Sequence, residues 1–135
     1  MSQNENNDLY IWKINGLELP FDGENLEDSE QAYKAFEKMG ASEKAMKKDV
    51  DIFVTVRAYC DLYFTCMSDI FGTETAEKIF SGVRYNARKC EEIYDSFMDF
   101  LHAQNKAQTQ RYIQRSKKYA PISPNREQRR VQAKK

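Results

Sequence analysis

The segment from Val50 to Phe71 is the most apolar stretch of the chain, and it constrains the fold more than any other feature. It is interrupted by four charged residues: Asp51, Arg57, Asp61 and Asp69. Each would cost roughly 2.5–3.5 kcal/mol at the centre of a bilayer, which argues against a membrane span. Apolar residues recur at helical spacing on more than one face, as is typical of a helix at the centre of a domain. We predict a helix over residues 43–71, with the other elements packed around it.

The rest of residues 9–101 predicts one mainly α, α+β domain. Residues 9–21 hold two strand-forming runs separated by Asn15-Gly16, a dipeptide that tolerates the positive φ angles of a type I′ hairpin turn. Two strands alone are marginally stable, so we expect the hairpin to pack on a small helical bundle. Helices are predicted over residues 25–39, 43–71, 74–80 and 84–101. Gly40 is the expected end of the first helix, and Ser42 the expected cap of the second.

Both ends of the chain differ from this domain. Residues 1–8 are polar and lack the basic and apolar regions of a signal peptide, so we expect them to be disordered. Residues 102–118 are helix-permissive but polar, which predicts a helical extension standing clear of the domain. Residues 119–135 contain two prolines and few core-forming residues, and they are predicted to be a flexible basic tail.

The net charge of zero conceals a strong segregation of charge. Residues 1–101 hold 11 basic and 20 acidic residues, a net charge of −9, whereas residues 102–135 hold 10 basic and 1 acidic, a net charge of +9. A basic tail on an acidic body predicts a segment that contacts a partner. The candidate partner-binding residues are Arg111, Arg115, Lys117, Lys118, Arg126, Arg129, Arg130, Lys134 and Lys135.

The polar residues do not predict an enzyme or a cofactor site. No Walker A, GxGxxG, GxSxG or HExxH pattern is present in the sequence. Cys60, Cys66 and Cys90 are not spaced like zinc ligands, and we expect reduced, buried thiols that pack in the core. His102 lies at the edge of the polar extension, where we expect it to be exposed. We therefore predict a non-enzymatic protein with no metal and no cofactor.

One stretch carries a resemblance to a known family. Residues 69–82 read "DIFGTETAEKIFSG", they follow the Asn15-Gly16 hairpin, and an arginine-rich segment stands at residues 125–130. This arrangement resembles the small tail assembly chaperones of long-tailed phages and prophages of Gram-positive bacteria. The motif residues are Asn15, Gly16, Ile70, Phe71, Gly72, Ala76, Glu77, Lys78, Ile79, Phe80 and Gly82. We expect them to serve the fold, as helix ends and packing residues, rather than chemistry.

The resemblance implies a function. Such chaperones are thought to coat the long, helical tape-measure protein until tail-tube subunits displace them. The expected partners are therefore the tape-measure and tail-tube proteins, in the cytoplasm of the bacterial host. Self-association is a further expectation, because the acidic body and basic tail suit contact between copies.

Two alternatives remain open from the sequence. The basic tail could bind nucleic acid in a regulatory phage protein, although it lacks the interleaved aromatic residues that stack on bases. The protein could instead be a minor structural component of the tail or its connector. Neither alternative requires an enzyme or a membrane.

Overall fold

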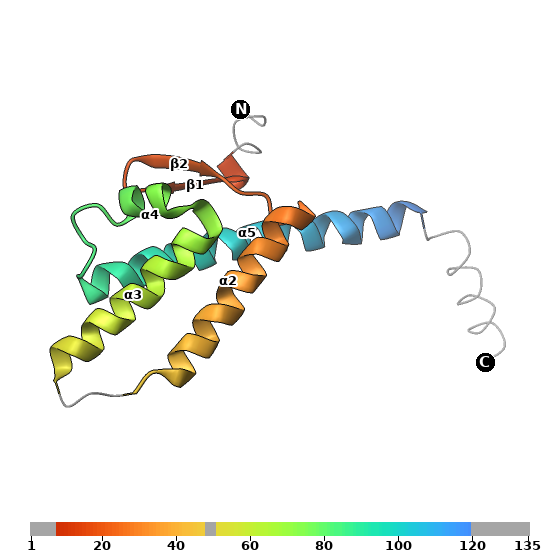
Figure 1. Cartoon of the computed structure of the whole chain (residues 1–135). Helices are drawn as coiled ribbons and strands as arrows, with labels where there is room; N and C mark the ends of the chain where they lie inside the picture. The colour runs from red at the N-terminus through yellow and green to blue at the C-terminus, as the bar shows by residue number, and fades with distance from the viewer. Residues whose placement is uncertain (1–7, 48–50, 120–135) are drawn as a thin grey trace.

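The computed structural model describes residues 8–47 and 51–119. Its element order is β1 (Ile11–Ile14), β2 (Leu17–Pro20), α2 (Leu26–Ala45), α3 (Ile52–Phe71), α4 (Thr73–Ile79) and α5 (Ala87–Tyr119) (Figure 1). This confirms the predicted mainly α, α+β class, with an N-terminal antiparallel hairpin followed by helices. None of the described helices is long and apolar enough to cross a membrane.

The hairpin turns where the sequence predicts. Asn15 has a φ of 49° and Gly16 a φ of 77°, the positive values that a type I′ turn requires at both central residues. Ile14 pairs with Leu17, and the register continues outward to the pair Ile11 and Pro20. Pro20 therefore stands in the outermost pair of the ladder, where the lack of a backbone N–H costs least stability.

The first two helices differ from their predicted bounds. α2 runs to Ala45, so the expected stop at Gly40 is wrong. A glycine inside a helix costs about 1 kcal/mol relative to alanine, which packing of the helix against its neighbours can outweigh. Helix-forming residues on both sides of Gly40 allow the turns to continue. A single glycine therefore does not predict the end of a helix when the residues on both sides of it favour the helix.

α3 begins at Ile52, so the predicted start near residue 43 and the cap at Ser42 are also wrong. The N-cap is Asp51, whose carboxylate accepts a hydrogen bond from the backbone N–H of Phe53 at 2.9 Å. Aspartate at this position satisfies one of the amide groups that the first helical turn leaves unpaired.

Aromatic packing joins the hairpin to the helices. Trp12 of β1 is 2% exposed and stacks on Phe71 of α3 at 5.7 Å between ring centroids. Its ring also meets Phe97 of α5 at 4.9 Å, and its Nε1–H donates to Ser96 Oγ at 3.0 Å. The indole is buried with its polar atom satisfied, which is the usual condition for a buried tryptophan. The hairpin is therefore part of the core, as predicted.

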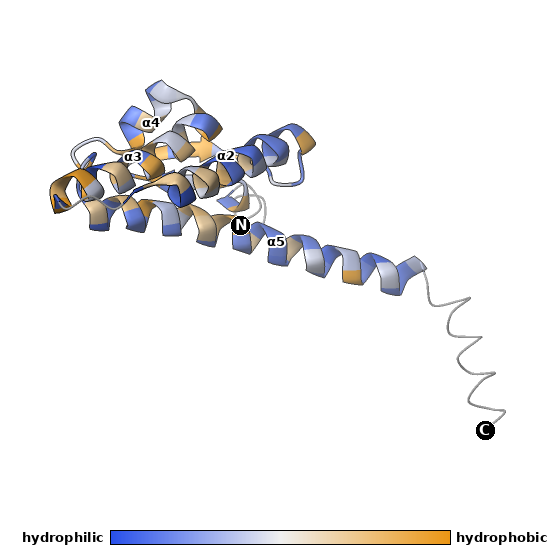
Figure 2. Cartoon of the chain, turned by 60° about the horizontal axis from the view of Figure 1, so that its bottom comes forward, coloured by the Kyte–Doolittle hydropathy of each residue, from blue (hydrophilic) through white to orange (hydrophobic). Residues whose placement is uncertain are grey.

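The last helix unites two predicted segments. α5 begins at Ala87, three residues after the predicted start, because Asn86 accepts a hydrogen bond from the backbone N–H of Lys89 at 3.0 Å and caps it. It then continues without a break through the predicted extension at residues 102–118 and projects beyond the other helices (Figures 1 and 2). Residues 120–135, which hold nearly all of the predicted basic tail, lie outside the described residues, as do residues 1–7.

Candidate partner-binding surface

The projecting half of α5 is the most exposed part of the fold. The first half buries Cys90, Ile93 and Phe97 in the core, and Gln104 is its last buried residue. Every residue from 109 to 119 is exposed. Three of these are large apolar or aromatic side chains: Tyr112 at 55%, Ile113 at 43% and Tyr119 at 66% exposure. The exposed apolar side chains of this projecting half make it a candidate contact surface.

Three of the predicted partner-binding cations lie freely accessible on this half. Arg115, Lys117 and Lys118 are exposed. The guanidinium of Arg115 and the ammonium of Lys118 each lie 5.4 Å from the ring centroid of Tyr119. The remaining predicted cations, Arg126, Arg129, Arg130, Lys134 and Lys135, lie outside the described residues.

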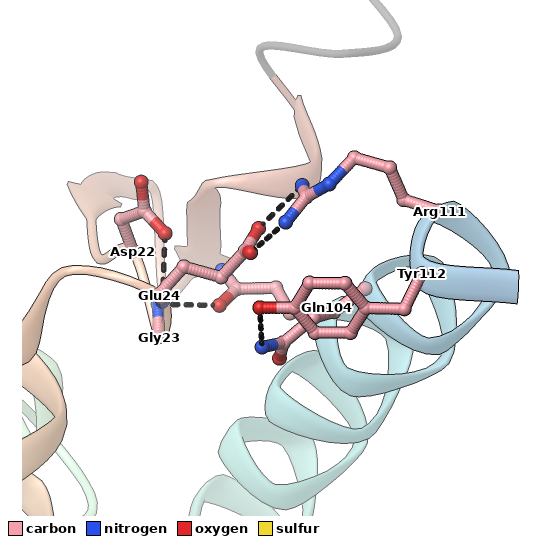
Figure 3. Close-up of polar contacts among 7 residues, drawn as sticks. Asp22, Gly23, Glu24, Gln104, Arg111 and Tyr112 are labelled. Carbon is pink, nitrogen blue, oxygen red and sulfur yellow. Dashed lines mark hydrogen bonds and ion pairs between the residues drawn. The ribbon is translucent and has the colours of Figure 1, made fainter. Parts of the chain in front are cut away.

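Arg111, a further predicted partner-binding cation, is paired within the chain. Its guanidinium forms a two-pronged pair with Glu24, in which Nη1 donates to Oε2 at 2.8 Å and Nη2 donates to Oε1 (Figure 3). The hydrogen bonds lower the pKa of Glu24 and raise the pKa of Arg111. Arg111 thus ties the base of the projecting half to the loop before α2, because a planar guanidinium matches a carboxylate at both oxygens.

Gln104 is a structural residue that the sequence reasoning missed. It is 6% exposed, and its Nε2 donates to the backbone carbonyls of Leu9 at 2.9 Å and Phe21 at 2.7 Å. Its Oε1 accepts the backbone N–H of Gly23 at 2.8 Å (Figure 3). One amide therefore fastens both ends of the hairpin to α5. The spacing of Gln104 could have predicted its burial, because position 104 follows Phe97 by two helical turns and so lies on the same face of the helix.

A groove of about 500 Å³ lies between α2 and α5, beside this polar cluster. Its apolar lining comprises Phe21, Ala32, Tyr33, Phe36, Met98 and Leu101. Its polar lining comprises Gly23, Glu24, Ser29, His102, Gln104, Asn105 and Gln108. Tyr33 is 64% exposed along it, and His102 is exposed as predicted. An apolar groove with a polar rim can accept a side chain or an amphipathic helix.

The family-motif residues serve the fold. Asn15 donates from its side-chain amide to the backbone carbonyls of Lys78 and Ile79, each at 3.2 Å, and so caps the C-terminal end of α4. Gly72 and Gly82 have φ values of 94° and 80°, which favour glycine. Four motif residues are buried, namely Ile70, Ala76, Ile79 and Phe80, and Phe71 packs against the core. Gly16 completes the hairpin turn, whereas Glu77 and Lys78 are exposed.

The cysteines are buried and unpaired, which confirms the predicted packing role. Burial raises the pKa of the Cys66 thiol to about 12, and burial also raises the pKa of Cys90. Such thiols are poor nucleophiles at neutral pH. Over residues 8–47 and 51–119, no group of three or more His, Cys, Asp or Glu side chains is arranged to hold a metal ion.

Comparison with known proteins identifies one family. Neither the curated proteins nor the solved structures gave a significant match. A family model described as "Family of unknown function (DUF6673)" matches residues 15–133. That range includes the hairpin turn, the motif at residues 69–82 and the whole of α5. The chain therefore belongs to this family of unknown function, DUF6673.

Proposed function

We propose that this protein is a non-enzymatic tail assembly chaperone of a long-tailed phage or prophage. It binds the tape-measure protein, the tail-tube protein or both during tail morphogenesis, in the cytoplasm of the bacterial host. The observation that carries the proposal is the motif at residues 69–82, together with the hairpin that packs on it through Asn15.

The surface of the domain supports this proposal. A chaperone for a long helical protein must cover apolar side chains and later release them, which calls for modest, adaptable interfaces. The groove between α2 and α5 offers an open apolar lining, and Tyr33 stands exposed along it. An amphipathic helix can lay its apolar face into such a groove.

Co-expression with the tape-measure protein of the same genome tests the proposal. We expect the soluble fraction of the tape-measure protein to rise, and the two proteins to purify together. Tyr33→Glu should abolish both effects by placing a charge in the groove. Phe53→Glu is the matched control, because Phe53 is 78% exposed at the far end of α3 and should leave both effects intact. A tape-measure protein that stays insoluble with every variant would contradict the proposal.

Two measurements separate the chaperone from its alternatives. Mass spectrometry of purified phage particles should find no copies of a chaperone, whereas a structural tail or connector component would be present. Duplex DNA should not bind in mobility-shift titrations at low salt. Binding that weakens steeply with salt and depends on Arg115, Lys117 and Lys118 would instead support a nucleic-acid-binding role.

A further inference from the structure

One face of α5 carries a continuous row of residues along both halves of the helix. The row contains Met98, Leu101, Asn105, Gln108, Tyr112, Arg115 and Tyr119. The spacing alternates between three and four residues, the repeat that keeps side chains on one side of a helix and faces a partner helix. Gln108 Nε2 donates to the Tyr112 hydroxyl at 3.4 Å, which links the two halves of the row.

The two halves of this row have different surroundings. Met98, Leu101, Asn105 and Gln108 line the groove, where α2 supplies the opposite wall. Tyr112 and Tyr119 stand on the projecting half, where residues 109–119 are all exposed. One face of α5 therefore lines an apolar groove in its first half and carries exposed aromatic side chains, Tyr112 and Tyr119, in its projecting half.

We propose that two copies of this chain pair through this face as a symmetric dimer. The two α5 helices run antiparallel, and Tyr112 and Tyr119 of each copy enter the groove between α2 and α5 of the other. The groove half centres near residue 101 and the aromatic half near residue 115, so the two-fold axis passes close to Gln108. Antiparallel pairing about that point fills both grooves at once.

The charges on the two halves are complementary. Exposed carboxylates stand one helical turn from the groove lining: Glu30 and Glu37 flank Tyr33 on α2, and Asp95 precedes Met98 on α5. The projecting half carries Arg115, Lys117 and Lys118. The antiparallel arrangement brings these cations beside the carboxylates at the groove of the other copy. A parallel arrangement would place the cations of one copy beside the cations of the other. Electrostatic complementarity of this kind fixes orientation and register.

The proposed contact limits the assembly to two copies. In a two-fold arrangement each copy gives its aromatic half and receives that of its partner, so no groove remains open to a third copy. The dimer occupies the groove that the proposed function assigns to a helix of the tape-measure protein, so that protein would have to displace the partner copy. The association of the chain with itself is measured without the tape-measure protein, so its failure is distinguishable from failure of the proposed function.

Sedimentation equilibrium of the full chain over a range of concentrations tests the association. We expect a single monomer–dimer equilibrium. The double variant Tyr112→Glu/Tyr119→Glu should raise the dimer dissociation constant roughly tenfold or more, as for loss of central aromatic anchors. Both tyrosines are exposed in the monomer, so circular dichroism should show unchanged helix content. Phe53→Glu is the control and should dimerise as the native chain does. A monomer at all concentrations, or growth beyond two copies, would overturn the proposal.

Single-cysteine cross-linking tests the register. The native cysteines are buried, so an introduced surface thiol reacts selectively. Gln108→Cys should form a disulfide with its own counterpart across the two-fold axis. Tyr119→Cys should not, because two residues 119 would lie roughly 33 Å apart at 1.5 Å per residue. Cross-linking at both positions would indicate a parallel pair, and cross-linking at neither would indicate a different interface; each result would refute the arrangement.

Discussion

The backbone N–H of Gly23 donates a hydrogen bond to Oε1 of Gln104 at 2.8 Å, although the two residues are 81 positions apart. The same side chain holds the carbonyls of Leu9 and Phe21 through its amide nitrogen. All three contacts depend on one buried amide. Gln104 therefore holds the backbone on both sides of the hairpin to α5, in addition to the contacts that Trp12 makes with Ser96 and Phe97.

Gln104→Leu should lower the free energy of unfolding by about 2–3 kcal/mol, because it leaves buried backbone groups without partners. Urea denaturation measures the change. Gln110→Leu is the matched control on the exposed part of α5, and it should change stability by less than about 0.5 kcal/mol. Equal losses in the two variants would show that Gln104 does not hold the hairpin.

Gly23→Ala should also destabilise the domain. A Cβ at this position would stand 2.9 Å from Gln104 Oε1, and the amide cannot move away without weakening the bond that Oε1 accepts from Gly23 and the bonds that Nε2 donates to Leu9 and Phe21. We expect a loss of about 1–2 kcal/mol. The loss should shrink in a Gln104→Ala background, where the obstructing atom is gone.

Gly40→Ala is the control for this change and should have the opposite sign. No atom lies within 4 Å of the position that its Cβ would occupy, and the residue is inside α2. Alanine in place of a helical glycine stabilises by about 0.5–1 kcal/mol. Thermal denaturation of both variants checks the pair of predictions, and a destabilised Gly40→Ala chain would contradict the helix at this position.

The pair of Glu24 and Arg111 should make stability depend on acid pH. The hydrogen bonds from Arg111 lower the pKa of Glu24 from its ordinary value of 4.5. The contact therefore stabilises the fold above pH 4.5, and its contribution is lost as the pH falls through the lowered pKa. Unfolding at pH 6 and pH 3 should show a smaller difference in Arg111→Met than in the native chain. Arg115→Met should behave like the native chain.

The buried thiols should also make stability depend on pH in the alkaline range. The pKa of Cys66 is raised from 9.0 to about 12 by burial, so the neutral thiol is favoured in the folded state. The contribution of Cys66 to stability should be constant below pH 9 and fall as the pH rises toward 12. Cys66→Ala should flatten this decline when unfolding is measured from pH 8 to pH 11.

A thiol reagent provides the accompanying test at neutral pH. At pH 8 it should label no cysteine in the native protein and all three in denaturant. Rapid labelling of the native protein would contradict the burial of the cysteines.

The sequence predicted the elements that depend on residues close together in the chain, such as the hairpin turn. Asn15-Gly16 tolerates the positive φ angles of the tight turn at both positions, and the apolar spacing predicts the buried residues Cys60, Met67 and Ile70 of α3. The same spacing includes Ile52 and Phe53, which are exposed at the start of α3. The predicted bounds of α2 and α3 were wrong because α2 continues through Gly40 and includes Ser42, and because Asp51 caps α3.

The candidate surface was predictable only in part. The exposed cations on the extension follow from its composition. The pair of Arg111 with Glu24 was not predicted, because Glu24 is 87 residues away in sequence and near only in the fold. The groove depends in the same way on how α2 meets α5, which no single segment encodes.

The attachment of the hairpin by Asn15, Trp12 and Gln104 has a consequence for the order of folding. β1 and β2 leave the ribosome before the helices, yet the groups that hold this segment belong to α4 and α5, between 63 and 95 residues later. Contacts of such long range form late, because the intervening chain must first be brought together. We therefore expect the N-terminal strands to reach their native packing last, against helices that have already formed.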